Sequence, residues 1–304
     1  MVDESGEHIG RNGRWGYCAP GCPRAVDDRK RDGSVTEDTS LTAALKNNNI
    51  DLARELLADN ETDVNKPNKD GETPLFVASS NGQLEFVKII LNTNGGKLSL
   101  NQADSVAGDN PLIKALWNLQ IDVAKQLLNF DEIDVNKSTK QGETPLFVAS
   151  INGLIEIVRI LLNTPEGKMS LNAALPETGA TPLIAATRNN HVGIVRELLS
   201  YNQTDVNKPN TDGETPLLVA SKNGNGELVK ILLNAEDGKL SLNQGLPETG
   251  ATPLLEALGN NHTDVAIELL SHNETDVNEP NKGGETPLFV ASTNGQAKVV
   301  KPRT

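Results

Sequence analysis

The sequence has little cysteine. Its two cysteines, Cys18 and Cys22, both lie within the first 38 residues, and the rest of the chain has none. This usage is compatible with a reducing compartment. Cys18 and Cys22 could pair with each other or could join His8 in a metal site. Three candidate ligands are one fewer than a structural zinc site needs, so we predict no metal site.

Aromatic residues, basic charge and long apolar runs are also scarce. Aromatics make up 3% of the chain, so leucine, isoleucine, valine and alanine must build the core. The net charge is −13, and such an acidic chain repels a phosphate backbone. No apolar run approaches the ~20 residues that span a bilayer, and the start of the chain lacks the pattern of a signal peptide. We therefore expect no nucleic-acid or membrane partner and no cofactor, with a cytoplasmic location by default.

A repeated helix start is the main positive feature. Successive starts lie alternately 37 and 34 positions apart, so every second start lies 71 positions further on. A divergent unit without the proline begins near Thr39. Such spacing predicts a row of similar units, each touching only its neighbours. The triplet Thr-Pro-Leu begins at Thr73, Thr144, Thr181, Thr215, Thr252 and Thr286, with Asn110-Pro-Leu112 in the remaining position.

Residues 142–163 show how one unit is built. Gly142 suits a turn with positive φ, Thr144 can cap a helix start, and Pro145 fits the first helical turn. Asn152-Gly153 can end this helix, and an apolar second helix follows. Two helices of about eight residues are marginal alone, so the unit needs its neighbours.

The units resemble the ankyrin repeat family. The resemblance covers residues 39–304 and implies an all-α solenoid of stacked antiparallel helix pairs with β-hairpin fingers. We expect about eight units, the last one incomplete, preceded by a flexible tail at residues 1–38. The matching motifs are Gly179-Ala-Thr-Pro-Leu-Ile-Ala-Ala186, Asn190-His191, Ile194-Val195, Leu198-Leu199 and Thr204-Asp-Val-Asn207.

The chain departs from the family pattern in three ways. The 37-residue units are longer after the second helix, so alternate fingers should differ in shape. The last unit stops at Lys298-Val-Val-Lys-Pro-Arg-Thr304, which indicates a fragment or a protein that continues. The family's histidine after Thr-Pro-Leu is replaced by an apolar residue, so packing should replace its hydrogen bond between units. The replacements are Phe76, Ile113, Phe147, Ile184, Leu218, Leu255 and Phe289.

Three other motifs occur in the chain. Residues 13–23 include Trp-Gly-Tyr-Cys, which resembles the closing stretch of fibronectin type II modules, but the upstream cysteines of such a module are missing. This part of the tail is at most a truncated cysteine-containing module. Leu175-Pro-Glu-Thr-Gly179 and its copy at residues 246–250 spell a cell-wall sorting signal, but both are internal and lead into a helix start. His191 and His262 lie where the family keeps a structural histidine.

Nothing in the sequence indicates catalysis, because its carboxylates repeat with the units and no nucleophile-and-base pattern interrupts them. The resemblance implies a scaffold, expected to be a monomer, that binds another protein on a concave surface of first helices and fingers. Trp117 is the leading candidate, since large aromatics are enriched at binding hot spots, with core filling as the equal alternative. The candidate residues are Ser80, Trp117, Asn118, Ile151, Arg188, Lys222 and Thr293 on first helices, with Lys69, Lys140 and Thr211 on fingers.

Two other functions stay open. The repeats could be the ankyrin portion of a larger truncated receptor, channel or enzyme. The chain could instead be a secreted binder, in which case Asn60, Asn202 or Asn273 would carry glycans.

Overall fold

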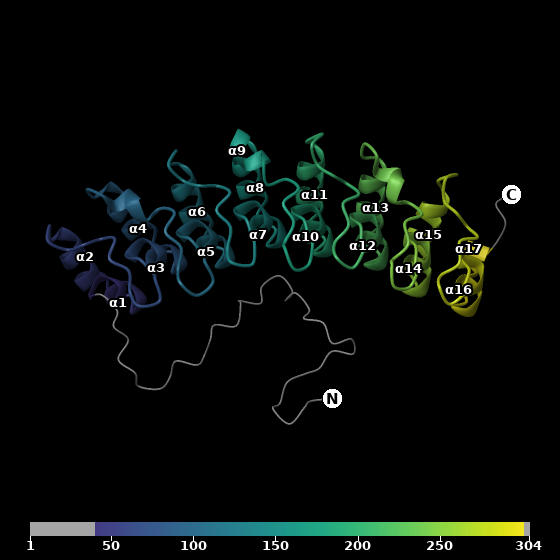
Figure 1. Ribbon diagram of the computed structural model, residues 1–304, viewed down its shortest axis with the longest axis horizontal. Helices are drawn as coiled ribbons and strands as arrows, with labels where there is room; N and C mark the ends of the chain where they lie inside the picture. The colour runs from purple at the N-terminus through teal and green to yellow at the C-terminus, as the bar shows by residue number, and fades with distance from the viewer. Residues whose placement is uncertain (1–39, 301–304) are drawn as a thin grey trace, which may run out of the picture. The chain divides into compact units, whose positions relative to one another are not determined.

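In the computed structural model, which describes residues 40–300, eight helix pairs lie side by side in one row (Figure 1). The predicted tail and the fibronectin-like stretch lie outside the described residues. The first helices of the pairs are α1 (Ser40–Lys46), α3 (Pro74–Ser80), α5 (Pro111–Trp117), α7 (Pro145–Ile151), α10 (Pro182–Arg188), α12 (Pro216–Lys222), α14 (Pro253–Gly259) and α16 (Pro287–Thr293). The second helices are α2 (Ile50–Ala58), α4 (Leu84–Asn92), α6 (Ile121–Leu128), α8 (Ile155–Leu162), α11 (Val192–Leu199), α13 (Gly226–Leu233), α15 (Thr263–Leu270) and α17 (Ala297–Val300).

The cap predicted for the first helices is present. Thr144 Oγ1 accepts a hydrogen bond from the Phe147 amide at 3.2 Å, and Pro145 occupies the first turn, where no amide donor is needed. Asn110 caps α5 in the same way through its Oδ1, 2.8 Å from the Ile113 amide. The residues that begin each first helix from α3 onward, the cap and the proline, therefore lie next to one another in the sequence.

One apolar core runs through the whole row. It extends from Leu41 in α1 to Ala291 in α16 and is made almost wholly of leucine, isoleucine, valine and alanine. The apolar residues that replace the family histidine are buried between units, with Phe147 1% exposed, whereas Phe289 in α16 is 53% exposed. The expectation that packing takes over at this position is confirmed for every unit from α3 to α14.

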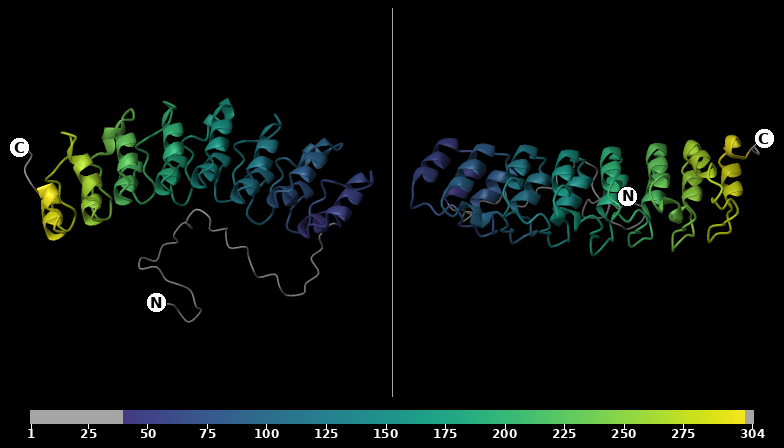
Figure 2. Two further views of the ribbon diagram at one scale, coloured as in Figure 1. Left: turned by 180° about the vertical axis from the view of Figure 1, so that it is seen from behind. Right: turned by 90° about the horizontal axis from the view of Figure 1, so that it is seen from above.

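The segments between the units project to one side of the helices, as the view from above in Figure 2 shows. We call their tips the fingers; they comprise residues 68–73, 104–110, 139–144, 175–181, 210–215, 246–252 and 281–286. Each is a tight turn closed by a backbone hydrogen bond, such as Thr139 N to Glu143 O at 3.1 Å. No strand occurs anywhere in residues 40–300, so the predicted β-hairpin form is not confirmed.

Neighbouring fingers are joined by backbone hydrogen bonds at some junctions only. The Ser105 amide donates to Asp70 O at 2.8 Å, and the Thr211 amide donates to Thr178 O at 2.9 Å. The corresponding donor positions at two other junctions are Pro176 and Pro247, which have no N–H. Both prolines belong to the internal Leu-Pro-Glu-Thr-Gly motifs, which the structure shows to be finger turns.

Asparagine side chains join the units on the opposite edge of the row. Asn172 Nδ2 donates to Gln203 O at 2.6 Å, and its Oδ1 accepts from the Asp205 amide at 2.8 Å. Asn101 and Asn243 make the same pair of bonds at equivalent positions. At the alternate junctions a different asparagine, such as Asn136, donates to a carbonyl of the next unit. The row therefore has two kinds of junction that alternate.

Each 37-residue unit carries one short extra turn after its second helix. These turns are η1 (Gly96–Ser99), α9 (Pro165–Lys168) and η2 (Gly238–Ser241). A residue near the end of each turn is apolar and strongly exposed: Leu98, Met169 and Leu240 are 75–79% exposed. The extra turns thus give every second unit a distinct outer edge.

Candidate protein-interaction surface

The last residues of successive first helices form a row along the inner edge of the stack. Figure 1 shows the first helices side by side along this edge. Asn118 Nδ2 donates to Ser80 O at 2.8 Å, which joins α5 to α3. Asn223 Nδ2 donates to Arg188 O at 3.1 Å, which joins α12 to α10. Candidate residues that belong to different units of the sequence are thereby brought next to one another.

Trp117 is partly buried and packs both on the main core and on a small second apolar cluster. This cluster combines Phe147 and Ile151 of α7 with Leu175 of the next finger and Ile184 of α10. Its place between first helices and a finger is the inner side of the stack. Trp117 is therefore half-buried: its side chain packs on this cluster and is in part open to solvent.

Ile151 was predicted to be a non-core residue of the binding surface. The structure shows it 8% exposed within the cluster beneath Trp117. Its cluster joins three units, because Leu175 and Ile184 lie further along the chain and Trp117 of the preceding unit packs against the cluster. Ile151 is therefore placed to support this surface rather than to be presented on it.

Arg188 and Lys222 are held by one carboxylate that the sequence reasoning missed. Glu214 Oε2 lies 2.7 Å from Arg188 Nη2, and its Oε1 lies 3.1 Å from Lys222 Nζ. Burial raises the pKa of the Glu214 carboxyl, but the charge of Arg188 and the hydrogen bond from Lys222 lower it more, so the pKa lies below its usual value. An ionised carboxylate thus fixes two cations of neighbouring units.

Glu214 was overlooked because a glutamate stands at the same place in every second unit. Glu72 also receives a cation from the preceding first helix, with Lys46 Nζ at 2.7 Å. A carboxylate that recurs at the same position of the repeat is usually an exposed polar residue, so this pattern alone does not indicate an ion pair. The available signal was the basic residue 26 positions before it, at Lys46 and again at Arg188.

The remaining candidates are exposed and in part held by backbone groups. Lys140 Nζ donates to Ser105 O at 2.6 Å, and Thr211 Oγ1 donates to Thr178 O at 3.0 Å, so both fasten their own finger to the preceding one. Thr293 bonds back within α16, to Phe289 O at 3.1 Å. Lys69 is exposed on the first finger.

His191 and His262, each just before a second helix, contact the preceding unit. His191 Nε2 lies 3.0 Å from Ile151 O, and His262 Nε2 lies 3.0 Å from Lys222 O, each in the preceding unit. Within residues 40–300 no three His, Cys, Asp or Glu side chains come together in a way that could hold a metal ion. In the same part of the chain, no helix has the length and apolar character needed to cross a membrane.

Comparison with known families agrees with this architecture. The model for "Ankyrin repeats (3 copies)" matches residues 23–102, 40–139, 96–174, 166–242 and 238–302. The chain belongs to the ankyrin repeat family. Ankyrin repeats are protein-interaction modules and are typically non-catalytic, so this chain contains such a module. The resemblance of residues 13–23 to fibronectin type II modules receives no support from these matches.

Several curated proteins are similar over part of the chain. A probable serine/threonine-protein kinase of Dictyostelium discoideum is 26% identical over 141 residues, 45% of this chain and 17% of its own length. The ankyrin repeat and SAM domain-containing protein 6 of Rattus norvegicus is 34% identical over 120 residues, 39% of this chain and 13% of its own length. Alpha-latrotoxin-Lg1a of Latrodectus geometricus is 29% identical over 126 residues, 41% of this chain and 9% of its own length. The matched part is a small fraction of each relative.

Proposed function

We propose that this chain is a non-catalytic scaffold whose ankyrin units bind a partner protein on the inner surface of first helices and fingers. The supporting observation is a change of character along the inner row. Units three and four present Trp117 over the apolar cluster, and units five and six present the Arg188–Glu214–Lys222 group. An anchoring aromatic beside a charged group is a common composition of a protein-binding hot spot.

The surface is held rigid before any partner arrives. Ion pairs, finger hydrogen bonds and the His191 contact join neighbouring units there. Because these side chains are already fixed, a partner that docks on them loses less conformational entropy on this side of the interface. We further propose that the chain is monomeric and cytoplasmic and has no nucleic-acid or membrane partner.

The test is capture of a partner by the full chain from a lysate of the source organism, followed by mass spectrometry. A Trp117→Ala/Lys222→Glu variant should lose the partner, whereas an Arg196→Ala/Lys230→Glu variant, altered on the second helices, should retain it. Thermal melting of all three proteins shows whether they are equally folded. Equal capture by both variants would contradict the proposed surface.

A second proposal is that these units are the interaction part of a larger receptor, channel or enzyme. The small share of each relative's length that is matched favours it. Immunodetection of the native protein distinguishes the two proposals. A mass close to that of the printed chain supports the stand-alone scaffold, and a much larger mass supports the second proposal.

A further inference from the structure

Two cavities occupy equivalent places on the edge opposite the fingers. The first, of about 380 Å³, lies between the segment after α6 and the start of α9. The second, of about 560 Å³, lies between the segment after α11 and η2. Most lining positions of the first cavity recur one two-unit period later in the second, from Leu128 and Leu199 to Asn136 and Asn207. The cavities therefore belong to one kind of junction and lie two units apart.

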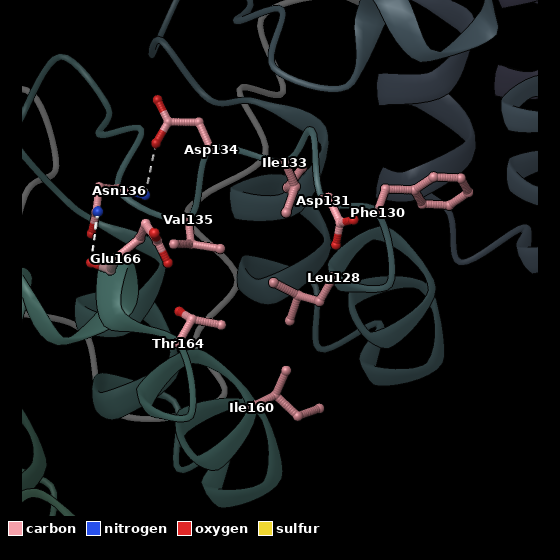
Figure 3. Close-up of a pocket in the computed structure, with 10 residues that line it drawn as sticks. All are labelled: Leu128, Phe130, Asp131, Ile133, Asp134, Val135, Asn136, Ile160, Thr164 and Glu166. Atoms are coloured by element: carbon pink, nitrogen blue, oxygen red, sulfur yellow. Dashed lines mark hydrogen bonds between the residues drawn. The ribbon is translucent and has the colours of Figure 1, made fainter.

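Each cavity is lined by both apolar and acidic side chains. Figure 3 shows Leu128 and Ile160, from α6 and α8, on one side of the first cavity, with Asp131 close to Leu128. Asp134 and Glu166 lie on the opposite side. The second cavity repeats this character with other residues. Its apolar lining includes Leu199, Tyr201 and Leu240, and its carboxyl groups are those of Asp205, Glu236 and Asp237.

These six carboxylates differ from those on the second helices. Along the second helices, glutamates pair with cations of the neighbouring unit, as in Arg159 with Glu197 at 2.9 Å and Arg196 with Glu227 at 3.0 Å. None of the six cavity carboxylates pairs with a lysine or arginine of the described residues. Asp134 and Asp205 accept only from the backbone two residues further on. These six carboxylates therefore have no ion-pair partner among the described residues.

Two ammonium groups lie on aromatic rings that line the cavities. Lys97 Nζ pairs with Glu132 at 2.8 Å and lies 5.0 Å from the centre of the Phe130 ring. Lys168 Nζ lies 5.4 Å from the centre of the Tyr201 ring. An aromatic residue that lines each cavity thus already accepts an ammonium group from the preceding unit, an attraction between a cation and the face of the ring.

We propose that the two cavities together bind a basic segment of a partner protein, in extended form, by two of its arginine or lysine side chains. The aliphatic stem of each side chain packs on the apolar lining residues of a cavity, and its charged end meets the carboxylates of the same lining. This second surface is distinct from the inner row, and it selects partners by positive charge combined with apolar character.

The repeat sets the spacing of those side chains. Packed helices lie about 8–10 Å apart, so two units separate the cavities by about 18 Å. An extended chain advances about 3.3 Å per residue, so the two basic residues should be about six residues apart. Exposed Leu240 at the second cavity, and Met169 at the corresponding place beside the first, offer apolar contact to the residues that flank them.

Synthetic peptides and the full chain test the proposal by fluorescence anisotropy. The probe has two Arg-Leu pairs whose arginines are six residues apart in a Gly/Ser background, and comparison peptides have arginines three residues apart or have serine in place of leucine. We expect the first peptide to bind at least tenfold more tightly than either comparison peptide, since only it engages both cavities. Binding should weaken as salt rises.

A matched pair of variants locates the binding. The Asp131→Asn/Glu166→Gln/Glu236→Gln/Asp237→Asn variant removes four cavity charges while keeping side-chain shape, and we expect at least tenfold weaker binding. The control Asp51→Asn/Glu55→Gln/Glu177→Gln/Asp264→Asn removes the same charge outside the cavities and should bind within twofold of the unaltered chain. Equal losses in both variants would reduce the effect to net charge and overturn the proposal. Equal affinity of the chain for all three peptides would also overturn the proposal. So would the absence of detectable binding of the first peptide at low salt.

Discussion

Arg188 Nη2 lies 2.7 Å from Glu214 Oε2, so a first helix is tied to the finger of the next unit by an ion pair. The side chain of Glu214 is only 12% exposed, and Lys222 Nζ reaches its other oxygen at 3.1 Å. The three residues join two consecutive units at the middle of the inner row. Any change there affects both the stability of the stack and the surface that a partner would meet.

The Glu214 pair predicts an acid-sensitive contribution to stability. The folded pKa of Glu214 is lowered from its usual 4.5, so the contribution is complete above that value and is lost as pH falls through the lower folded pKa. Glu214→Gln should destabilise the chain by about 1–3 kcal/mol at pH 7 and by much less at pH 3. Urea unfolding at both pH values measures this. Glu227→Gln, in the exposed pair with Arg196, serves as the control, and an equal effect there would contradict the interpretation.

Internal symmetry offers a matched test of packing at the position of the family histidine. Phe147→Ala should cost about 3–5 kcal/mol, because the side chain is 1% exposed between two units. Phe289→Ala, at the same place in α16, should cost well under half of that, because this ring is 53% exposed. Denaturant titration of both variants gives the comparison. Similar losses would mean that Phe289 is covered in solution.

The asparagine contacts predict that removing the Asn172 side chain lowers the stability of the fold, whereas removing the Asn202 side chain does not. Asn172→Ala removes two hydrogen bonds to the next unit and should destabilise by about 1–3 kcal/mol. Asn202→Ala changes an exposed loop residue and should have little effect. Thermal melting of both variants decides, and the prediction fails if Asn172→Ala melts with the unaltered chain.

A finger glycine tests close approach between units. Gly142 and Gly284 have φ of 82° and 80°, so alanine is strained at either place. At Gly142 an added Cβ would also meet Pro176 Cδ at 2.5 Å, whereas at Gly284 nothing lies within 4 Å. Gly142→Ala should therefore cost about 1–3 kcal/mol more than Gly284→Ala in chemical denaturation. Equal costs would show that the finger yields without strain.

The local features of the fold could be predicted from the sequence, and its junctions could not. The Thr144 cap and the positive φ of Gly142 depend on residues a few positions apart, so their signals are contiguous. The burial of Ile151 in a cluster with residues of other units, and the role of Glu214 beside Arg188 of the preceding unit, both depend on contacts between units. To predict either contact one must know which residues of neighbouring units face each other, and the repeat period alone does not give that pairing.

The paired cavities were missed for a related reason. Their carboxylates lie in segments that look like ordinary polar turns, and only the stacking of a shorter unit on a longer one brings them beside Leu128 and Ile160. The two-unit period was visible in the sequence, from the even spacing of Thr73, Thr144 and Thr215. The cavities lined by apolar and acidic residues, which recur with this period, are seen only in the folded structure.

The alternation of two junction types also limits how such a chain can change in length. A junction that uses Asn172 is followed by one that uses Asn207, and the fingers lose a backbone bond at Pro176 and again at Pro247, one full period later. Removal of a single unit would bring unlike edges together and leave these donors facing the wrong acceptors. Deletion or duplication of two units keeps the order of the junction types, so the asparagine donors again face the matching acceptors. The segment that can be removed or added without changing the order of junctions is therefore two units long, such as residues 73–143.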